Sequence, residues 1–316
     1  MAQSAATFTP NESPGYSLTI RRFVNSIWRK RSWLIAFLLL DIYVISLIIN
    51  DPRVGEAWAY VSPGISISMG ITVVSFLFSI ILGLFVSILR ISKNPILYNL
   101  STLYVELFRG LPLLVIILIF NFVVVPQLID RIGGTADEVN DAGETVTGYP
   151  TIVIIDDFLQ RLVGIPEERI ESTTIRSRDI DESWRIVLAF AVTYGAFMSE
   201  VFRAGIESIG RGQMEASRSL GMSYFQAMRY IILPQAIRNI LPALGNNFIL
   251  LLKDTSLASS VAVPEVSYLT RQFSSNRFRY GEPLLVLSFI YANLTIILAL
   301  FVNALEYYLH ADKREG

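Results

Sequence analysis

Polar and charged side chains follow one another where a long apolar stretch of the sequence ends, and they could bind a small polar solute. Asp254 could pair with an amino group, and Thr255 or Ser256 could donate a hydrogen bond to a carboxylate. The alternative is structural, with Lys253 and Asp254 neutralising each other and packing against neighbouring helices. Four further polar residues on the same predicted helix and on the one before it could join such a site: Asn246, Asn247, Tyr194 and Glu200.

A short internal echo adds two pairs of opposite charge. Glu106 and Arg109 recur as Glu200 and Arg203, and in each pair the residues are three apart, so that they share one face of a helix. Charges that face lipid are costly, and we therefore expect both pairs to face the interior of a helix bundle. Structural ion pairs are the favoured interpretation, and a role in gating is the alternative.

Composition shows what must position these side chains. Of 316 residues, 53% are hydrophobic and 17% charged, whereas soluble chains carry about a quarter charged residues. A bilayer core takes roughly 20 mostly apolar helical residues to cross. The fold class expected is an all-α polytopic membrane protein with about six transmembrane helices. The apolar blocks are Leu34 to Ile49, Ile65 to Leu89, Leu111 to Val125, Ile186 to Met198, Ile237 to Leu252 and Leu284 to Tyr308.

Several classes of function are disfavoured by what the sequence contains. The net charge is −1, and no basic tract with interleaved aromatic residues suggests binding to nucleic acid. The chain has no cysteine, and its single histidine, His310, lies in a polar tail, so neither a thiol nor a histidine-based catalytic or metal site is expected. A membrane-embedded enzyme is accordingly disfavoured. The start of the chain is polar, and its basic run comes late, unlike a cleavable signal peptide.

Basic residues in short loops set the expected orientation. A basic run from Arg21 to Arg31 precedes the first helix and places the N-terminus in the cytoplasm, and alternation of six helices places the C-terminus there too. Arg271, Arg277 and Arg279 conflict with this scheme, because it puts their loop outside.

The segment after the fourth block predicts a rigid cytoplasmic element. Gly210 and Gly212 are expected to end the membrane helix and turn the chain. Gln213–Leu220 reads as a helix of about two turns, closed by Gly221 in a left-handed cap, and Ser223 offers a cap for the next helix. A short helix with small residues and rigid ends could pack closely against a partner protein and transmit a movement of that partner to the membrane helices.

This segment resembles the EAA loop of binding-protein-dependent ABC importers, with Ser217 in place of the usual second alanine. The matching positions are Glu215-Ala216-Ser217, Gly221, Ile231 and Leu233-Pro234. The resemblance implies that this loop is a coupling helix, seated in a groove of an ATP-binding subunit through Glu215, Ala216, Ser217, Leu220 and Gly221.

A finer resemblance covers most of the chain from residue 65. It is to the permeases for polar amino acids, the histidine, glutamine, glutamate and arginine group, and it implies a type I importer fold in a bacterial inner membrane. It also implies a pair of permeases, identical or homologous, two ATPase subunits and an external solute-binding protein. The similar stretches are Tyr104 to Leu114, Glu200 to Ile206, Leu233 to Ala236 and Leu252 to Ala258.

The resemblance and the hydropathy pattern together divide the chain. The family usually has five transmembrane helices, so the first helix, with Asp41 at its middle, is an addition; we expect Asp41 to make a buried hydrogen bond. The segment 128–183 is an insert rich in acidic residues. It is expected to be an extracytoplasmic elaboration, and docking or gating against a delivery protein is the alternative. The expected segments are a cytoplasmic stretch 1–32, the extra helix 33–50, the permease core 51–127 and 184–309, the insert 128–183, the coupling loop 205–233 within the core, and the tail 310–316.

The chain is not expected to bind ATP itself. A phosphate-binding loop needs a lysine directly after a glycine, and none of the four lysines follows one. ATP and Mg²⁺ would therefore be held by a partner subunit, and no cofactor by this chain. A secondary transporter or channel is the remaining alternative, and it would leave the coupling motif unexplained.

Overall fold

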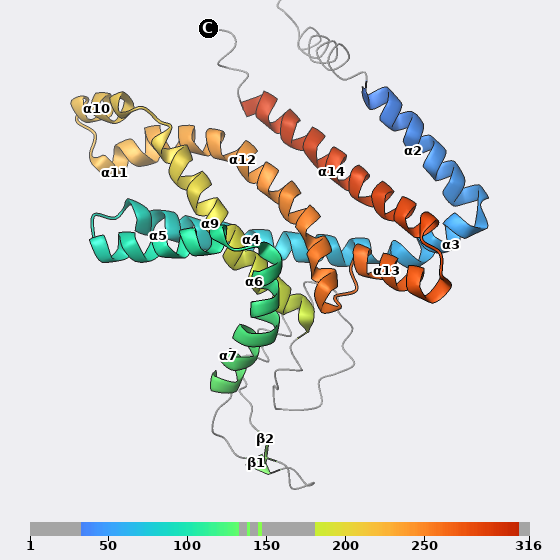
Figure 1. Ribbon diagram of the computed structural model, residues 1–316. Helices are drawn as coiled ribbons and strands as arrows, with labels where there is room; N and C mark the ends of the chain where they lie inside the picture. Colours follow the sequence, from blue (N-terminus) through green and yellow to red (C-terminus); the bar gives the residue numbers. More distant parts are fainter. Residues whose placement is uncertain (1–32, 133–137, 140–144, 147–180, 310–316) are drawn as a thin grey trace, which may run out of the picture. The chain divides into compact units, whose positions relative to one another are not determined.

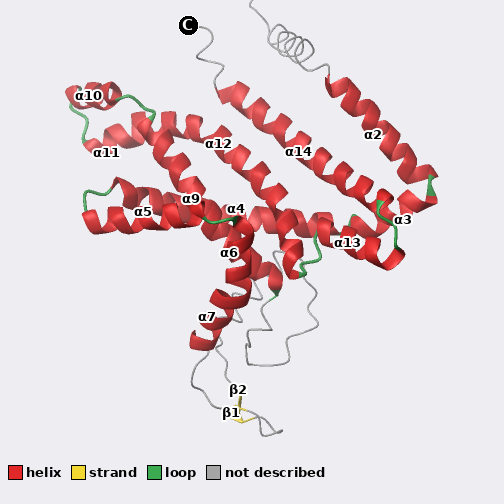
Figure 2. Cartoon of the chain, viewed as in Figure 1, coloured by secondary structure: helices red, strands yellow, loops and turns green. Residues whose placement is uncertain are grey.

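The computed structural model describes residues 33–132, 138–139, 145–146 and 181–309, and these are almost entirely helical (Figure 2). Expectations for the N-terminal stretch, for most of the insert 128–183 and for the tail with His310 lie outside the described residues. The chain divides into two compact units, Met1–Gly55 and Glu56–Gly316. The first contains α2 (Trp33–Asn50), an apolar helix in which Asp41 is partly exposed, and the start of α3 (Pro52–Val61).

The second unit is built around three long helices, α4 (Gly64–Ile91), α5 (Pro95–Gly110) and α9 (Glu182–Glu207) (Figure 1). Local sequence explains where two of them begin. The Asn94 side chain accepts a hydrogen bond from the Ile96 N–H at 2.9 Å with Pro95 in the first turn, and Asp181 accepts from the Ser183 N–H at 2.8 Å. Both are side-chain caps of N–H groups that would otherwise lack a partner.

After α5 the chain bends by 107° and continues as α6 (Leu113–Ile119), the π-helical turn η1 (Phe120–Val124) and α7 (Val125–Ile132). Pro112 lies at this bend, where its ring and missing N–H prevent α5 from continuing. Two short antiparallel strands follow, β1 (Glu138–Val139) and β2 (Thr145–Val146), with Glu138 opposite Val146.

The C-terminal half begins with α10 (Arg211–Ser219) and α11 (Tyr224–Ala227). A π-helical turn, η3 (Met228–Ile232), then leads into α12 (Leu233–Asp254). The 3₁₀-helix η4 (Thr255–Val261) connects α12 to α13 (Val266–Arg277), and α14 (Gly281–Leu309) ends the described chain. In Figure 1, α10 and α11 lie at one end of α12 and α13 at the other.

Small residues let α4 and α9 approach each other closely. A Cβ added at Gly83 of α4 would lie 2.7 Å from the Met198 Cβ and 3.0 Å from the Gly195 carbonyl oxygen, both on α9. The α4 residues Ser75 and Ser79 are fully buried. Close approach through glycine and serine is the usual packing mode of membrane helices, which have no hydrophobic effect to press them together.

Four helical segments are long and apolar enough to cross a membrane, or up to five if the bent pair of α5 with α6–α7 counts as one span. They are α2, α3 with α4, α9 and α14. The fifth predicted block, Ile237–Leu252, lies inside α12, which is 22 residues long. Arg238, Asn246, Asn247 and Lys253 make this helix less apolar than the others. The all-α fold expected from the sequence is thus present, with α12 as its most polar long helix.

The arginines that conflict with the predicted orientation are held by local partners. Glu56 of α3 forms ion pairs with Arg277 at 2.8 Å and Arg279 at 3.0 Å. Arg279 also pairs with Glu282 at 3.2 Å, and Arg271 donates to the Ser259 carbonyl. These contacts explain how the arginines are held locally, but they do not remove the conflict, because the positive-inside rule counts lysines and arginines and not net charge.

Gly83→Val tests the close packing of α4 on α9. Added methyl groups would meet the α9 backbone, which cannot move aside as a flexible side chain can, and overpacking of this kind costs about 1–3 kcal/mol. We expect a lower midpoint of thermal denaturation in detergent. Gly110→Ala is the control, because nothing lies within 4 Å of a Cβ there. Equal midpoints for the two variants would contradict the packing described.

Candidate functional site

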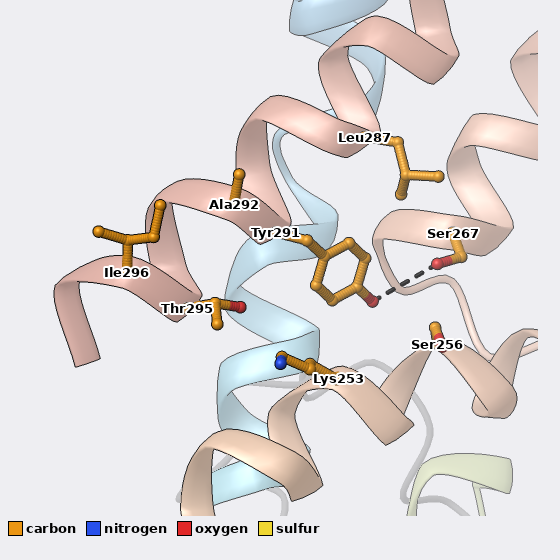
Figure 3. Close-up of a pocket in the computed structure, with 8 residues that line it drawn as sticks. All are labelled: Lys253, Ser256, Ser267, Leu287, Tyr291, Ala292, Thr295 and Ile296. Carbon is orange, nitrogen blue, oxygen red and sulfur yellow. Dashed lines mark hydrogen bonds between the residues drawn. The ribbon is translucent and has the colours of Figure 1, made fainter. Parts of the chain in front are cut away.

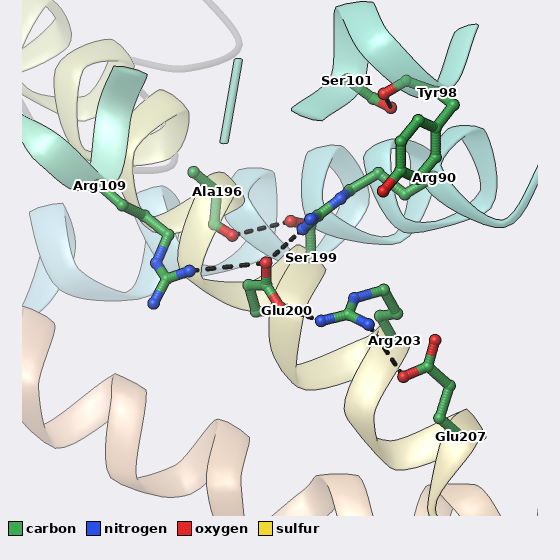
Figure 4. A network of polar contacts seen from close by, with 9 residues as sticks. All are labelled: Arg90, Tyr98, Ser101, Arg109, Ala196, Ser199, Glu200, Arg203 and Glu207. Carbon is green, nitrogen blue, oxygen red and sulfur yellow. Dashed lines mark hydrogen bonds and ion pairs between the residues drawn. The ribbon is translucent and has the colours of Figure 1, made fainter. Parts of the chain in front are cut away.

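One carboxylate, Glu200 of α9, gathers guanidinium groups from three helices (Figure 4). Its Oε1 is paired with Arg90 of α4 and lies 3.5 Å from Nη1 of Arg109 of α5, and its Oε2 lies 2.8 Å from Arg203. Arg203 also bonds Glu207 at 2.9 Å, one turn further along α9. The Arg90 side chain is only 8% exposed and that of Glu200 is 22% exposed, whereas Arg109 and Arg203 are more exposed, so the network ties α4, α5 and α9 together around a poorly exposed pair.

The two predicted charge pairs have different outcomes. Glu200 and Arg203 do pair and face inward, as expected. The prediction for Glu106 and Arg109 is wrong: Glu106 is exposed and has no ion pair with any described residue, whereas Arg109 reaches α9. The Arg109 guanidinium also lies 5.7 Å from the centre of the Phe197 ring. The carboxylate and ring of α9 thus provide Arg109 with better partners than its neighbour on its own helix.

Two candidate pathway residues from different helices are brought together. The Tyr194 hydroxyl of α9 donates to Oδ2 of Asp254, at the end of α12, at 2.6 Å. Tyr194 is 1% exposed, and Asp254 is partly exposed. Asp254 forms no ion pair with Lys253 among the described residues, because consecutive residues on a helix point in different directions. Lys253 and Asp254 are thus not joined by a direct ion pair, although their charges interact at longer range.

Lys253 instead lines a pocket of about 510 Å³ between the end of α12, α13 and α14 (Figure 3). The predicted residue Ser256 lines it too. Ser267 and Tyr291 add hydroxyl groups whose oxygens lie 3.4 Å apart, and Thr295 adds a third. The remaining wall is apolar: Leu287, Ala292 and Ile296. One ammonium and several hydroxyl groups over an apolar wall make this pocket suited to a carboxylate.

The other two predicted pathway residues are less well placed. Thr255 is fully buried and donates to the Leu252 carbonyl at 2.7 Å, so it faces the protein and not a pathway. Asn247 is partly exposed on α12, and its amide nitrogen is buried without a hydrogen-bond partner among the described residues. Asn246 beside it is exposed.

Sequence reasoning missed Glu265, which is fully buried. Its carboxylate caps α13 by accepting from the N–H groups of Ser267 and Tyr268 at 2.9 and 2.8 Å. It also accepts from the hydroxyl of Tyr291 of α14 at 3.1 Å and from that of Ser68 of α4 at 3.4 Å. An acidic residue between Val261–Val263 and Val266, just after a membrane block, was a signal that could have identified it.

The predicted short helix is α10, and its end is built as the sequence indicates. Gly221 has φ +82°, its N–H donates to the Arg218 carbonyl at 3.0 Å, and the Met222 N–H donates to the Ser217 carbonyl at 3.2 Å. These two bonds form a Schellman cap. The Ser223 side chain accepts from the Gln226 N–H at 3.2 Å and the Gln226 side chain from the Ser223 N–H at 2.8 Å, a complete capping box.

One detail at the start of α10 differs from expectation. Gly210 precedes the helix as its cap, but Gly212 lies within its first turn and does not break it. With a free surface around both glycines, nothing prevents helical geometry at Gly212.

Four of the five predicted coupling residues lie on a free surface. Glu215, Ala216, Leu220 and Gly221 are exposed, and the Leu220 side chain is 83% exposed. Ser217 is different: it is 5% exposed, and its hydroxyl donates to the Gln213 carbonyl of the same helix at 2.6 Å, so its side chain faces the protein rather than the free surface. Three aromatic side chains that follow are exposed as well: Tyr224, Phe225 and Tyr230. Apolar side chains held in solvent on a rigid element are typical of a protein-binding surface.

Comparison with known proteins places this arrangement among transporters. The family model described as binding-protein-dependent transport system inner membrane component matches residues 79–315. The chain is 31% identical over 240 residues to the probable amino-acid permease protein YxeN of Bacillus subtilis (strain 168). The aligned region covers 76% of this chain and 87% of YxeN. It is 34% identical over 221 residues to the probable amino-acid ABC transporter permease protein PatM of Vibrio harveyi, 70% of this chain and 78% of that one.

Solved structures agree with this. An amino acid ABC transporter crystallised with histidines has a chain that superposes with a TM-score of 0.61 and 25% identity, covering 82% of this chain and 99% of that chain. A chain of the MetNI methionine ABC transporter in an inward-facing conformation has a TM-score of 0.52 and 17% identity, and it shares the fold.

Glu200→Gln tests the ion-pair network around Glu200. It removes the charge that Arg90, Arg109 and Arg203 share, and loss of one partner from a poorly exposed ion pair costs about 3 kcal/mol. We expect a clearly lower thermal midpoint for the detergent-solubilised protein.

Glu207→Gln is the matched control for Glu200→Gln. The Glu207 side chain is 58% exposed, and an exposed ion pair contributes about 0–1 kcal/mol. If both variants melted together, Glu200 would not hold the three helices.

Proposed function

The chain belongs to the family of binding-protein-dependent transport system inner membrane components and is a permease subunit of an ABC importer; we propose that its cargo is a polar amino acid. The relatives that it resembles are named as amino-acid permeases, and the solved transporter contains histidines. The candidate groups in this chain have the chemistry that such a cargo requires. Asp254 offers a carboxylate for an ammonium group, and Lys253 with Ser256 offers donors for a carboxylate.

The observation that supports transport driven through α10 is the way this helix is connected to the candidate cargo-binding groups. α9, which contains Tyr194, ends at Glu207, three residues before the Gly210 cap of α10. On the other side of α10, α11, η3 and α12 follow one another from Tyr224 to Asp254. Both partners of the Tyr194–Asp254 hydrogen bond thus lie on helices that adjoin the coupling element, so a movement of α10 would be delivered to both.

We propose that ATP hydrolysis by a partner provides this movement. A dimer of ATPase subunits would hold ATP and Mg²⁺ and contact Glu215, Ala216, Leu220 and Gly221, while the buried Ser217 faces this chain. A second permease, identical or homologous, would complete the pathway, and an extracytoplasmic solute-binding protein would deliver the cargo. Both termini would then lie in the cytoplasm.

Within the pathway the candidate residues have unequal roles in this proposal. Asp254 retains free lone pairs beside its bond from Tyr194, so an ammonium group could replace or join the hydroxyl donor. Asn247 has an amide without a partner among the described residues and could donate to cargo. Glu200 is occupied by three arginines and Thr255 is buried, so we assign them to the framework.

Asp254→Asn should lower amino-acid uptake about tenfold, because a hydrogen bond to a charged group contributes about 1.5–3 kcal/mol. The amide keeps the size of the side chain and can still accept from Tyr194. The measurement is uptake of several radiolabelled amino acids into proteoliposomes containing the whole complex, with subunit assembly checked by gel filtration.

Asp51→Asn is the control for Asp254→Asn, since asparagine can replace the Asp51 carboxylate that accepts from the Arg53 N–H at 2.8 Å. Unchanged uptake for every amino acid in the Asp254 variant would assign Asp254 to structure.

Gly221→Asp should uncouple transport from ATP hydrolysis while membrane insertion is retained. A side chain at φ +82° strains the cap by about 1–2 kcal/mol, and a charge would enter the partner surface. We expect uptake to fall at least about tenfold relative to ATP hydrolysis measured on the same vesicles.

Gly221→Asn is the matched control, because asparagine tolerates the left-handed conformation and is neutral. Normal uptake by the aspartate variant, with the ATPase present, would refute the assignment of α10.

A further inference from the structure

The turn between α13 and α14 contains a conformation that its residue type does not favour. Phe278 ends α13 with φ +54° and ψ +33°, and its N–H donates to the Ser274 carbonyl, as does the Arg279 N–H at 3.3 Å. Glycine is the usual residue at such a helix end. A bulky side chain there strains the backbone, and such strain persists only where other interactions hold the conformation.

The Phe278 ring makes no contact within the described chain that would offset this strain, because its side chain is 86% exposed. Tyr280, two residues on, is 60% exposed. The other non-glycine residue with positive φ among the described residues is Ala262, at +65°, and it carries only a methyl group. Phe278 is therefore the position where a large apolar side chain is held in solvent at a backbone penalty.

Ion pairs on both sides hold the turn in place. Arg277 and Arg279 pair with Glu56 at 2.8 and 3.0 Å, and Arg279 pairs with Glu282 at 3.2 Å. The Arg279 guanidinium also lies 5.8 Å from the centre of the Phe273 ring. A tip fixed in this way loses little conformational entropy when a partner binds it, which favours tight association.

The position and charge of the turn indicate its partner. In Figure 1, α10 lies at one end of α12 and α13 lies at the other. The turn follows α13 and is therefore on the side of the protein opposite the exposed surface of α10. Three arginines, Arg271, Arg277 and Arg279, stand against two carboxylates, Glu56 and Glu282, which leaves one positive charge in excess. Aromatic and arginine side chains together are the usual anchors of protein interfaces.

We propose that the turn Arg277–Tyr280 is a docking knob for the solute-binding protein, with the Phe278 ring entering an apolar pocket rimmed by acidic side chains. This inference rests on the proposed function. A lipid surface is a weaker candidate for the partner, because a fluid bilayer accepts a ring in any orientation and does not require a strained backbone. A protein pocket does require one fixed direction.

Phe278→Gly separates the backbone strain from the ring. It relieves the left-handed conformation, so the thermal midpoint should be unchanged or higher, yet it removes the anchor. We expect the concentration of solute-binding protein that half-maximally stimulates ATP hydrolysis by the complex in nanodiscs to rise at least about tenfold, as for an interface hot spot. The basal ATPase rate and the maximal stimulated rate should stay the same.

Ala262→Gly is the matched control, since it relieves the same kind of strain without removing a large side chain, and it should not change the half-maximal concentration. If Phe278→Gly leaves that concentration unchanged while the wild-type complex is stimulated, the docking inference is overturned and the proposed function stands. If the solute-binding protein that delivers cargo to this complex does not stimulate even the wild type, the proposed function itself fails.

Discussion

The pairing of Glu200 with Arg90, Arg109 and Arg203 is the interaction on which the rest of the structure depends. A carboxylate or a guanidinium in a poorly solvated helix bundle is costly unless it is paired. Because the three arginines come from α4, α5 and α9, their shared partner fixes the relative position of these helices. The close approach of α4 to α9 at Gly83 acts in the same direction without any charge. Tyr194, six residues before Glu200 on α9, is thereby held where it can meet Asp254.

The same principle applies at the other carboxylates inside this permease. Glu265 is satisfied by two backbone N–H groups and two hydroxyls, and it joins α4, α13 and α14. Among the described residues, Asp254 has a single donor, Tyr194, and therefore keeps capacity for a further partner. A carboxylate with all its bonds made inside the protein stabilises a framework, whereas one with spare capacity can exchange partners as cargo passes. This difference, rather than position along the chain, separates the structural groups from the candidate functional ones.

Features set by neighbours in sequence could be predicted, and features set by contacts between distant helices could not. The apolar blocks predicted the long helices, Gly221 predicted the left-handed cap, and Ser223 predicted the start of the next helix. Each of these features depends on a few adjacent residues. Helix-face spacing correctly paired Glu200 with Arg203, but it wrongly paired Glu106 with Arg109, since only the packing of α5 on α9 brings Arg109 to Glu200. The contacts of Glu265 with Ser68 and Tyr291 could not be predicted for the same reason, although its place beside an apolar stretch marked it as a candidate. Lys253 and Asp254 are neighbours in sequence that serve different surfaces, which only the direction of α12 reveals.

The central claim is that α10 transmits the action of an ATP-binding partner to the helices that hold Tyr194 and Asp254. The chain has no cysteine, so Leu220→Cys would place a single thiol on the exposed side of α10. The most direct measurement attaches a thiol-reactive photocrosslinker there in the purified complex and identifies the adduct by mass spectrometry. We expect an adduct with an ATP-binding subunit, because α10 would lie against that subunit. Absence of that adduct, with the ATP-binding subunit still co-purifying, would refute a coupling role for α10.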